Sequence, residues 1–418
     1  MAPSLIASLT GLLLIVPIST ALTWTPMPNL HTLPSNCVAG NIHIGSEQIH
    51  AMNENISALP FALDFNDPAN VIRFAKVCLT TALTQWATPF TENITEPLPV
   101  TLQNLTLAAF FCKPEKPRKD IKALHVLVHD LTYDRWMWHG LGTDNATRFA
   151  YNLLRDGYYT LAIDLWGHSM SRAYGIPDPI HELQGPAHVE ILYSMLKDLR
   201  RKQDHEDSFS GIGVFDRIAY WGHGFGGHLG LSIVDKYPDD VDAIAISGHG
   251  IKRSGHSLGR FHELAPWRER APFYWRDPNS SPAYLVVDSV KDREETFYYP
   301  GDGHDEDFVK WDYRWMDMLA LGEVCSPGRV KYPIEHWMKP TLIVMGEHDS
   351  FAVNKKELGM LETQVMWSML RTRTFMFPEM NETAYYWKVE GASHNWMFHK
   401  SVQNVSLEEK FGGKWPGF

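Results

Sequence analysis

Two residues in the C-terminal part of the chain could perform acid–base chemistry together. His394 lies in the loop 391–395, GASHN, and Asp349 comes shortly after the apolar run 341–346. A carboxylate that orients an imidazole ring enables that ring to take a proton from water, a hydroxyl or a substrate carbon. We therefore predict that His394 and Asp349 form an acid–base dyad.

A third position, Gly224, lies where a buried strand should run directly into a helix. The segment 221–227 reads WGHGFGG, with glycines two residues before and two residues after Gly224. This is the context of a nucleophile elbow, in which small flanking residues allow a strained turn to lift one side chain above a sheet. Glycine has no hydroxyl for His394 to deprotonate, so no acyl-enzyme can form at this position.

The elements that would position these residues alternate along the chain. Buried strands are expected at 105–112, 123–129, 158–164, 217–221, 241–247, 341–346 and 384–390, and helices at 69–87, 145–155, 186–202 and 225–237. Parallel neighbouring strands need crossover connections, so this alternation predicts a mostly parallel sheet with helices on both faces. The expected fold class is a doubly wound α/β domain.

The alternation is interrupted between about residues 250 and 333 by a segment rich in aromatic and charged side chains. We interpret residues 251–335 as a cap inserted between two parts of the core, 121–250 and 336–418, and residues 22–120 as an N-terminal extension with lead-in strands. The simplest explanation of the aromatic residues is that they form the hydrophobic core of the cap. Their functional interpretation is a lid over an apolar substrate.

Several segments together resemble the α/β-hydrolase family, and within it secreted fungal-type members. HDLTYDR at 129–135 is similar to the family's H-G-L-T-Y-D-R segment, and LAID at 161–164, with Gly167 and Ser171, is similar to its A-I-D-x-x-G-x-x-x-S turn. GEHD at 346–349 resembles the acid turn, and 391–395 resembles the histidine loop. The resemblance covers about residues 105–399 and implies an α/β-hydrolase fold with the order nucleophile, acid, histidine.

Two positions depart from the family pattern. Gly224 stands where the family has serine, and Asp130 stands where it usually has glycine. The resemblance implies an oxyanion hole formed by the backbone N–H groups of Leu131 and Phe225, so Asp130 would place a carboxylate beside these donors. Both changes oppose ordinary ester hydrolysis. His223, next to the elbow, is expected to line the pocket.

Three functional hypotheses follow. The first is an enzyme that uses His394 and Asp349 for water activation, elimination or cyclisation of a small lipophilic molecule, as in secondary metabolism. The second is a catalytically inactive protein that binds a small molecule. The third is a serine esterase with a displaced nucleophile, for which Ser169 in GHSMS at 167–171 is the candidate. That segment leads into a loop with glycine and proline instead of a helix, so it lacks elbow geometry.

No cofactor or metal ion is expected. The chain has 20 histidines, but no pair at helical spacing with a neighbouring acid indicates a metal site. The net charge of −11, without a block of basic residues, argues against nucleic acid as a partner. The expected partner is a small, mostly apolar substrate.

The N-terminal segment, the sequons and the cysteines together predict a secreted protein. Residues 1–21 read as a signal peptide whose apolar run, 12–18, is too short to span a bilayer, so no stable membrane span is expected after its removal. Seven sequons are candidates for N-glycosylation: Asn55, Asn93, Asn104, Asn145, Asn279, Asn381 and Asn404. Four cysteines suit two disulfides in an oxidising compartment, and three pairings are possible among Cys37, Cys78, Cys112 and Cys325.

Overall fold

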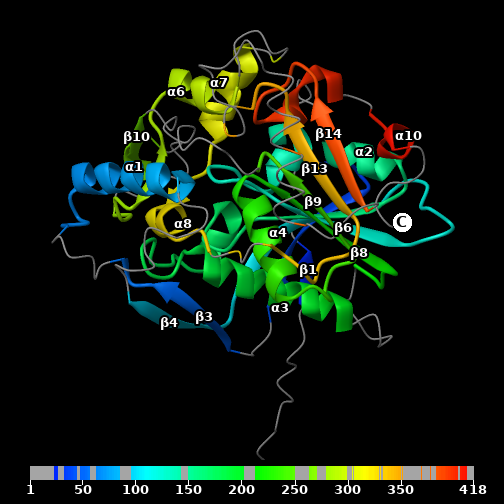
Figure 1. Cartoon of the computed structure of the whole chain (residues 1–418), viewed down its shortest axis with the longest axis horizontal. Helices are drawn as coiled ribbons and strands as arrows, with labels where there is room; N and C mark the ends of the chain where they lie inside the picture. The colour runs from blue at the N-terminus through cyan, green and yellow to red at the C-terminus, as the bar shows by residue number, and fades with distance from the viewer. Residues whose placement is uncertain are drawn as a thin grey trace, which may run out of the picture.

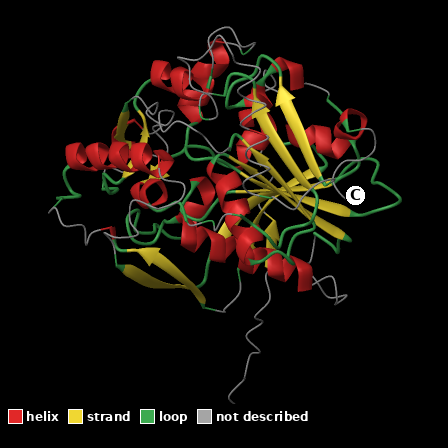
Figure 2. Ribbon diagram, viewed as in Figure 1, coloured by secondary structure: helices red, strands yellow, loops and turns green. Residues whose placement is uncertain are grey.

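The computed structural model describes residues 23–26, 33–44, 48–56, 63–84, 96–142, 149–201, 212–249, 263–270, 279–298, 304, 306–328, 330, 333–349, 351, 369, 377, 383–402 and 405–411. A nine-stranded sheet with helices on both faces occupies the centre of the molecule (Figures 1 and 2). The strand order is β1-β2-β5-β7-β6-β8-β9-β13-β14. The six strands from β7 to β14 run parallel, whereas β1, β2 and β5 add antiparallel pairs at one edge. The expected mostly parallel α/β class is confirmed.

The strands of this sheet are β1 (Thr23–Pro26), β2 (Cys37–His43), β5 (Thr106–Cys112), β6 (Ala123–Val128), β7 (Tyr159–Ile163), β8 (Arg217–His223), β9 (Ala243–Ser247), β13 (Thr341–Gly346) and β14 (Ala384–Val389). The helices that correspond to the expected ones are α1 (Pro68–Thr84), α2 (Phe149–Arg155), α3 (Gly185–Arg201) and α4 (Phe225–Lys236). The expected strands and helices agree with these bounds within a few residues, apart from the start of α2, since residues 143–148 lie outside the described residues. A separate two-stranded sheet pairs β3 (Ile49–Glu54) with β4 (Pro97–Leu102).

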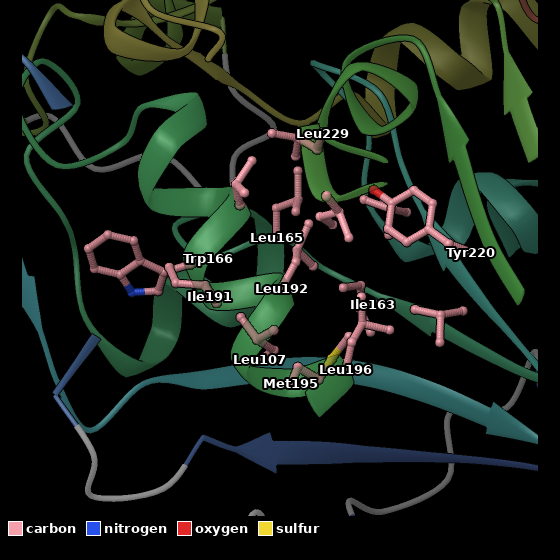
Figure 3. Close-up of a cluster of buried hydrophobic side chains, with 14 of the residues drawn as sticks. Leu107, Ile163, Leu165, Trp166, Ile191, Leu192, Met195, Leu196, Tyr220 and Leu229 are labelled. Carbon is pink, nitrogen blue, oxygen red and sulfur yellow. The ribbon is translucent and has the colours of Figure 1, made fainter. Parts of the chain in front are cut away.

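Side chains of the central strands alternate between two hydrophobic clusters, one on each face of the sheet. On β6, Val126 packs into the cluster that includes α3 and α4, and Leu127 packs into the cluster that includes α2. Figure 3 shows part of the first cluster, where Leu192 of α3 and Leu229 of α4 lie beside strand residues such as Tyr220. This alternation follows from the period of two in a strand. Burial on both faces explains why the strands read as continuous apolar runs.

The elements between β9 and β13 lie outside the large sheet. They include a three-stranded antiparallel sheet of β10 (Leu264–Pro266), β11 (Tyr284–Val287) and β12 (Leu319–Ala320), and the helices α5 (Trp267–Arg270), α6 (Val290–Phe297), α7 (Glu306–Trp315) and α8 (Leu321–Cys325). Figure 1 shows them gathered on the same side of the molecule as α1, which packs against α8 and β10. The cap boundaries at 251 and 335 stay a prediction.

Two disulfides select one of the three possible cysteine pairings. Cys37 bonds to Cys112, its antiparallel partner across β2 and β5, and Cys78 of α1 bonds to Cys325 of α8. Disulfides of this kind are typical of proteins that fold in an oxidising compartment. Within the described residues, no helix is both long and apolar enough to cross a bilayer.

Removing the longer-range disulfide should destabilise the protein measurably. Cys78 and Cys325 are 247 residues apart, so the bond restricts a very large loop in the unfolded chain. We expect replacement of both cysteines by alanine to lower the free energy of unfolding by about 2–5 kcal/mol. Denaturant titration of oxidised protein would measure this. Peptide mapping that finds Cys78 bonded to another cysteine would contradict the pairing.

The proposed modification sites fall partly within the described residues. Asn104 and Asn279 are exposed and Asn55 is half-buried. The signal segment 1–21 and the sequons at Asn93, Asn145, Asn381 and Asn404 lie outside the described residues. Secretion and glycosylation therefore stay predictions.

Candidate active site

The turn from β8 to α4 has the geometry expected of a nucleophile elbow. Gly224 has φ 49° and ψ −111°, and its N–H donates to the carbonyl of Ser247. Its neighbours must be small: a Cβ on Gly222 would lie 2.2 Å from the carbonyl oxygen of Gly226, and one on Gly226 would lie 2.5 Å from that of Val128. The backbone therefore forms the sharp turn expected of a nucleophile elbow, with glycine at position 224.

The carboxylate of Asp130 occupies the space that a side chain at position 224 would need. A Cβ built on Gly224 would lie 2.1 Å from Oδ1 of Asp130 and 2.2 Å from its Cγ. Oδ1 accepts a hydrogen bond of 2.6 Å from the N–H of Phe225, one of the two expected oxyanion donors. Leu131, the other expected donor, follows Asp130 in the same loop and is half-buried. A carboxylate from the loop after β6 thus fills the space beside Gly224 and binds the N–H of Phe225.

His394 lies between two carboxylates. Its Nδ1 is 3.1 Å and 3.2 Å from the two carboxylate oxygens of Asp349, and its Nε2 is 3.1 Å from Oδ2 of Asp130. Burial disfavours the charged ring, but the charge of Asp349 and the hydrogen bonds to both carboxylates raise the pKa of His394 to about 9. Burial also opposes ionisation of Asp130, but its bond to His394 outweighs this and lowers its pKa. These opposite pKa shifts favour an ion pair between the His394 imidazolium and the Asp130 carboxylate at neutral pH.

The loop that carries Asp130 is held by its neighbour His129. The His129 ring bonds through Nδ1 to the carbonyl of Asp130 at 2.8 Å, and its Nε2 accepts the N–H of Leu165 at 3.0 Å. Burial lowers the pKa of His129 to about 3, so the ring is neutral and donates through Nδ1. In the sequence, His129 belongs to a family-like segment, and no local pattern there indicates this positioning role.

Residues between β9 and β13 clamp the same loop. Thr132, with φ 63°, accepts hydrogen bonds from Arg293 through its hydroxyl at 2.5 Å and its carbonyl at 3.4 Å. Arg293 is fully buried and forms a bidentate ion pair with Asp312 at 2.8 Å and 2.9 Å. Asp312 also accepts from Tyr133 at 2.7 Å and from Tyr298 at 2.8 Å. Nothing in the local sequence around residues 293 and 312 indicated this role.

The acid turn and the histidine loop are tied to each other. Glu347 accepts the N–H of Gly391 at 2.8 Å, and Gly346 is needed because a Cβ there would lie 1.9 Å from the carbonyl oxygen of Ser393. The Ser393 hydroxyl donates to the carbonyl of Phe297 at 2.9 Å. The family-like segments at 346–349 and 391–395 therefore fix the relative position of Asp349 and His394, and the structure brings together the predicted acid and histidine.

His223 also faces this group. Its ring centroid lies 4.6 Å from that of His394, and a Cβ on Gly248 would touch Cε1 of both rings, at 2.5 Å and 2.7 Å. Burial and the positive charge of His394 lower the pKa of His223 to about 3, so its ring is neutral. Phe351 also packs against His394, with ring centroids 4.1 Å apart.

Ser169 makes a different set of contacts. Its hydroxyl donates to Oδ2 of Asp134 at 2.8 Å, and its N–H donates to Asp317 at 2.9 Å. Burial and the charge of Asp164 raise the pKa of Asp134 to about 7. The partner of the Ser169 hydroxyl is thus a carboxyl group, whereas His394 is paired with Asp130 and Asp349.

A second buried ionic cluster joins this side of the core to α8. Oε1 of Glu323 accepts from His168 at 2.7 Å and is 2.8 Å from Nε2 of His188, and the other ring nitrogen of His168 is 3.1 Å from Asp317. Burial disfavours the charged His168 ring, but the charge of Glu323 and the bonds to both carboxylates raise its pKa to about 10. Burial likewise opposes ionisation of Glu323, whose pKa is nevertheless lowered by His168 and His188.

Glu323→Gln should remove a pH-dependent part of the stability, about 1.5–3 kcal/mol. The folded-state pKa of His168 is raised from 6.5, so its contribution is complete below about pH 6.5 and is lost as the pH rises through 10. Glu323 contributes above its usual pKa of 4.5 and loses this contribution in acid. The difference in unfolding free energy between wild type and variant should therefore be largest between about pH 4.5 and 6.5. Denaturant titrations from pH 4 to 10 would measure it, and a constant difference would contradict the assignment.

Comparisons with known proteins agree with this architecture. The alpha/beta hydrolase family model matches residues 126–404, more than half of the chain, and the chain belongs to that family. Similar solved structures include a thermophilic esterase from Thermogutta terrifontis, with 14% identity, a TM-score of 0.42 and coverage of 69% of this chain and 87% of that one. E-2-(acetamidomethylene)succinate hydrolase gives 14% identity, a TM-score of 0.42 and coverage of 74% and 94%. No match was found among curated protein sequences. The identities to these two structures bear on the fold alone.

Proposed function

We propose that this protein acts on a small lipophilic substrate by acid–base chemistry at Asp130, His394 and Asp349, without an acyl-enzyme at position 224. The observation that carries the proposal is the Asp130 carboxylate in the space of the missing nucleophile, 3.1 Å from His394. A carboxylate acceptor beside an imidazolium donor can remove one proton and deliver another, which suits elimination or cyclisation. Attack by an activated water is the third reaction class compatible with this group.

Aromatic side chains beside His394 support an apolar substrate. Phe351 and Phe297 have ring centroids 4.1 Å and 5.9 Å from that of His394. A substrate that approaches the ring from this side would meet apolar surface, and water would be kept from the ion group. The two disulfides and the predicted signal peptide support the further proposal that the protein acts in the secretory pathway or outside the cell.

Turnover by His394 and Asp130 variants tests the proposal. Purified protein would be assayed with β-hydroxy ketones, as substrates for elimination, and with 4-nitrophenyl esters of increasing chain length. We expect His394→Ala and Asp130→Asn each to lower turnover about 10²–10⁴-fold, because each removes one proton-transfer group. His336→Ala, at an exposed position, is the matched control and should leave turnover unchanged. Turnover that survives in both site variants would overturn the proposal.

A second candidate function is binding without catalysis. Asp130 already bonds to both the Phe225 N–H and His394, so the groups that would act on a substrate are satisfied within the protein. If folded wild-type protein binds compounds tightly but converts none of them, the binding function is favoured over the enzyme.

A further inference from the structure

The group around Gly224 contains a set of side chains whose chemistry is that of a metal site. A ligand atom of each of Asp130, His223 and His394 lies within 4.8 Å of those of the other two, and all three residues are buried. Two imidazoles and one carboxylate are the ligands found in many catalytic zinc sites and in non-haem iron sites. Three protein ligands also leave a position open for water or substrate.

In each imidazole, the nitrogen Nδ1 has a hydrogen-bond partner, as is usual for histidines that bind a metal through the other nitrogen. Nδ1 of His394 is bound by Asp349, the carboxylate partner commonly seen behind a ligand histidine. Nδ1 of His223 is 2.7 Å from the hydroxyl of Ser247, which donates its own hydrogen to the carbonyl of Gly222 at 3.4 Å. When Ser247 donates to Gly222 in this way, the hydrogen on the His223 ring is on Nδ1 and Nε2 carries a lone pair.

The surroundings of Nε2 distinguish a ligand site from a closed ion pair. Nε2 of His223 is buried and has no hydrogen-bond partner at standard geometry among the described residues. The side chain of Asn395 interacts with the His223 ring, and its Oδ1 is also buried without a partner at that geometry. When the ring hydrogen is on Nδ1, both atoms are buried acceptors without a donor, which is costly unless something fills the need.

We infer that Asp130, His223 and His394 bind a divalent transition-metal ion, with zinc as the best fit. Two ligand atoms of a tetrahedral zinc ion are about 3.3 Å apart, given bonds of about 2.0–2.1 Å. The 3.1 Å between Asp130 and His394 is close to this separation, and a ring nitrogen of His223 lies within 4.8 Å of both ligand atoms. The ion replaces the hydrogen between Asp130 and His394, which leaves as a proton to solvent, and Oδ1 of Asn395 can accept from a water bound to the ion. This site goes beyond the proposed function and departs from the sequence-based expectation of no metal.

Metal binding can be measured without any substrate, so its failure is distinct from failure of the proposed function. Full-length protein stripped with EDTA and returned to chelator-free buffer would be titrated with ZnCl₂ and CoCl₂ by calorimetry. We expect one ion per chain. His223→Asn keeps a polar group near Ser247 and removes Nε2. Loss of a residue that only hydrogen-bonds to a metal ligand lowers metal affinity about 10–100-fold, and loss of the ligand His223 should lower the zinc affinity by more than this.

His228→Asn is the matched control, because His228 lies on α4 and its Nε2 is 3.0 Å from the carbonyl of Gly328. It should bind zinc as the wild type does. Equal affinities of His223→Asn and wild type, or no stoichiometric binding to wild type, would overturn the inference. X-ray absorption of zinc-loaded wild type gives a test that needs no variant: two imidazole ligands with oxygen support the site, and any other number of imidazoles contradicts it.

Discussion

Gly224→Ser alone should react poorly with a fluorophosphonate serine probe, whereas Gly224→Ser combined with Asp130→Gly should be labelled readily. The single variant places its Cβ 2.1 Å from Oδ1 of Asp130, and Asp130 also occupies the Phe225 N–H that would stabilise the phosphonyl oxygen. Loss of one oxyanion donor typically costs about 10²–10³-fold in rate, and we expect labelling of the single variant to be slower than that of the double variant by this factor.

The control for this experiment is the double variant with His394→Ala added, which should abolish labelling because no base remains to activate the introduced serine. Wild type should not be labelled. Circular dichroism and thermal unfolding would establish that each variant is folded. A single variant labelled as fast as the double variant would show that Asp130 does not occupy the place of the nucleophile.

Asp312→Asn should lower the free energy of unfolding by about 3–5 kcal/mol, because it leaves the Arg293 charge buried without its partner. Both side chains are fully buried, and Oδ2 of Asp312 accepts from Arg293, Tyr133 and Tyr298. A guanidinium stays protonated in proteins, so Arg293 keeps its charge in Asp312→Asn. His168 in Glu323→Gln, in contrast, can lose its charge by releasing a proton. Denaturant titration at pH 7 would measure the loss.

The matched control is Asp307→Asn, since Asp307 also lies on α7 but is exposed and pairs with Lys310. Surface ion pairs contribute about 0–1 kcal/mol, so this variant should be nearly as stable as wild type. Equal stability of Asp312→Asn and wild type would contradict the ion pair as the clamp of the loop that carries Asp130.

The sequence predicted the large parallel part of the fold well because buried parallel strands have a strong local signature. The strand expected at 341–346 has the bounds of β13, and the helix expected at 225–237 differs from α4 by one residue at its end. β2, with the sequence CVAGNIH, was not predicted, because its glycine and asparagine interrupt the apolar pattern of a strand. Its pairing with β5 stabilises the strand in spite of these residues.

At the site, the order of the segments predicted which residues meet, but not how they meet. Asp349 and His394 form the expected dyad geometry, and the Phe225 N–H lies beside Asp130 as the resemblance implied. The position of the Asp130 carboxylate above Gly224 depends on the backbone of two loops, which no local pattern specifies. Arg293 and Asp312 are far from the motifs in sequence, so their contact with the Asp130 loop could be seen only in three dimensions.

We propose that Asp130 has taken the place of the nucleophile as the partner of His394. Histidine side-chain NMR of metal-free protein, with the His394 signal assigned from its loss in His394→Gln, measures this most directly. We expect His394 to titrate with a pKa of about 9 in wild type and distinctly lower in Asp130→Asn, because the Asp130 charge and hydrogen bond both raise that pKa. A His394 signal that titrates near 6.5 in wild type, or at the same pH in both proteins, would contradict the account.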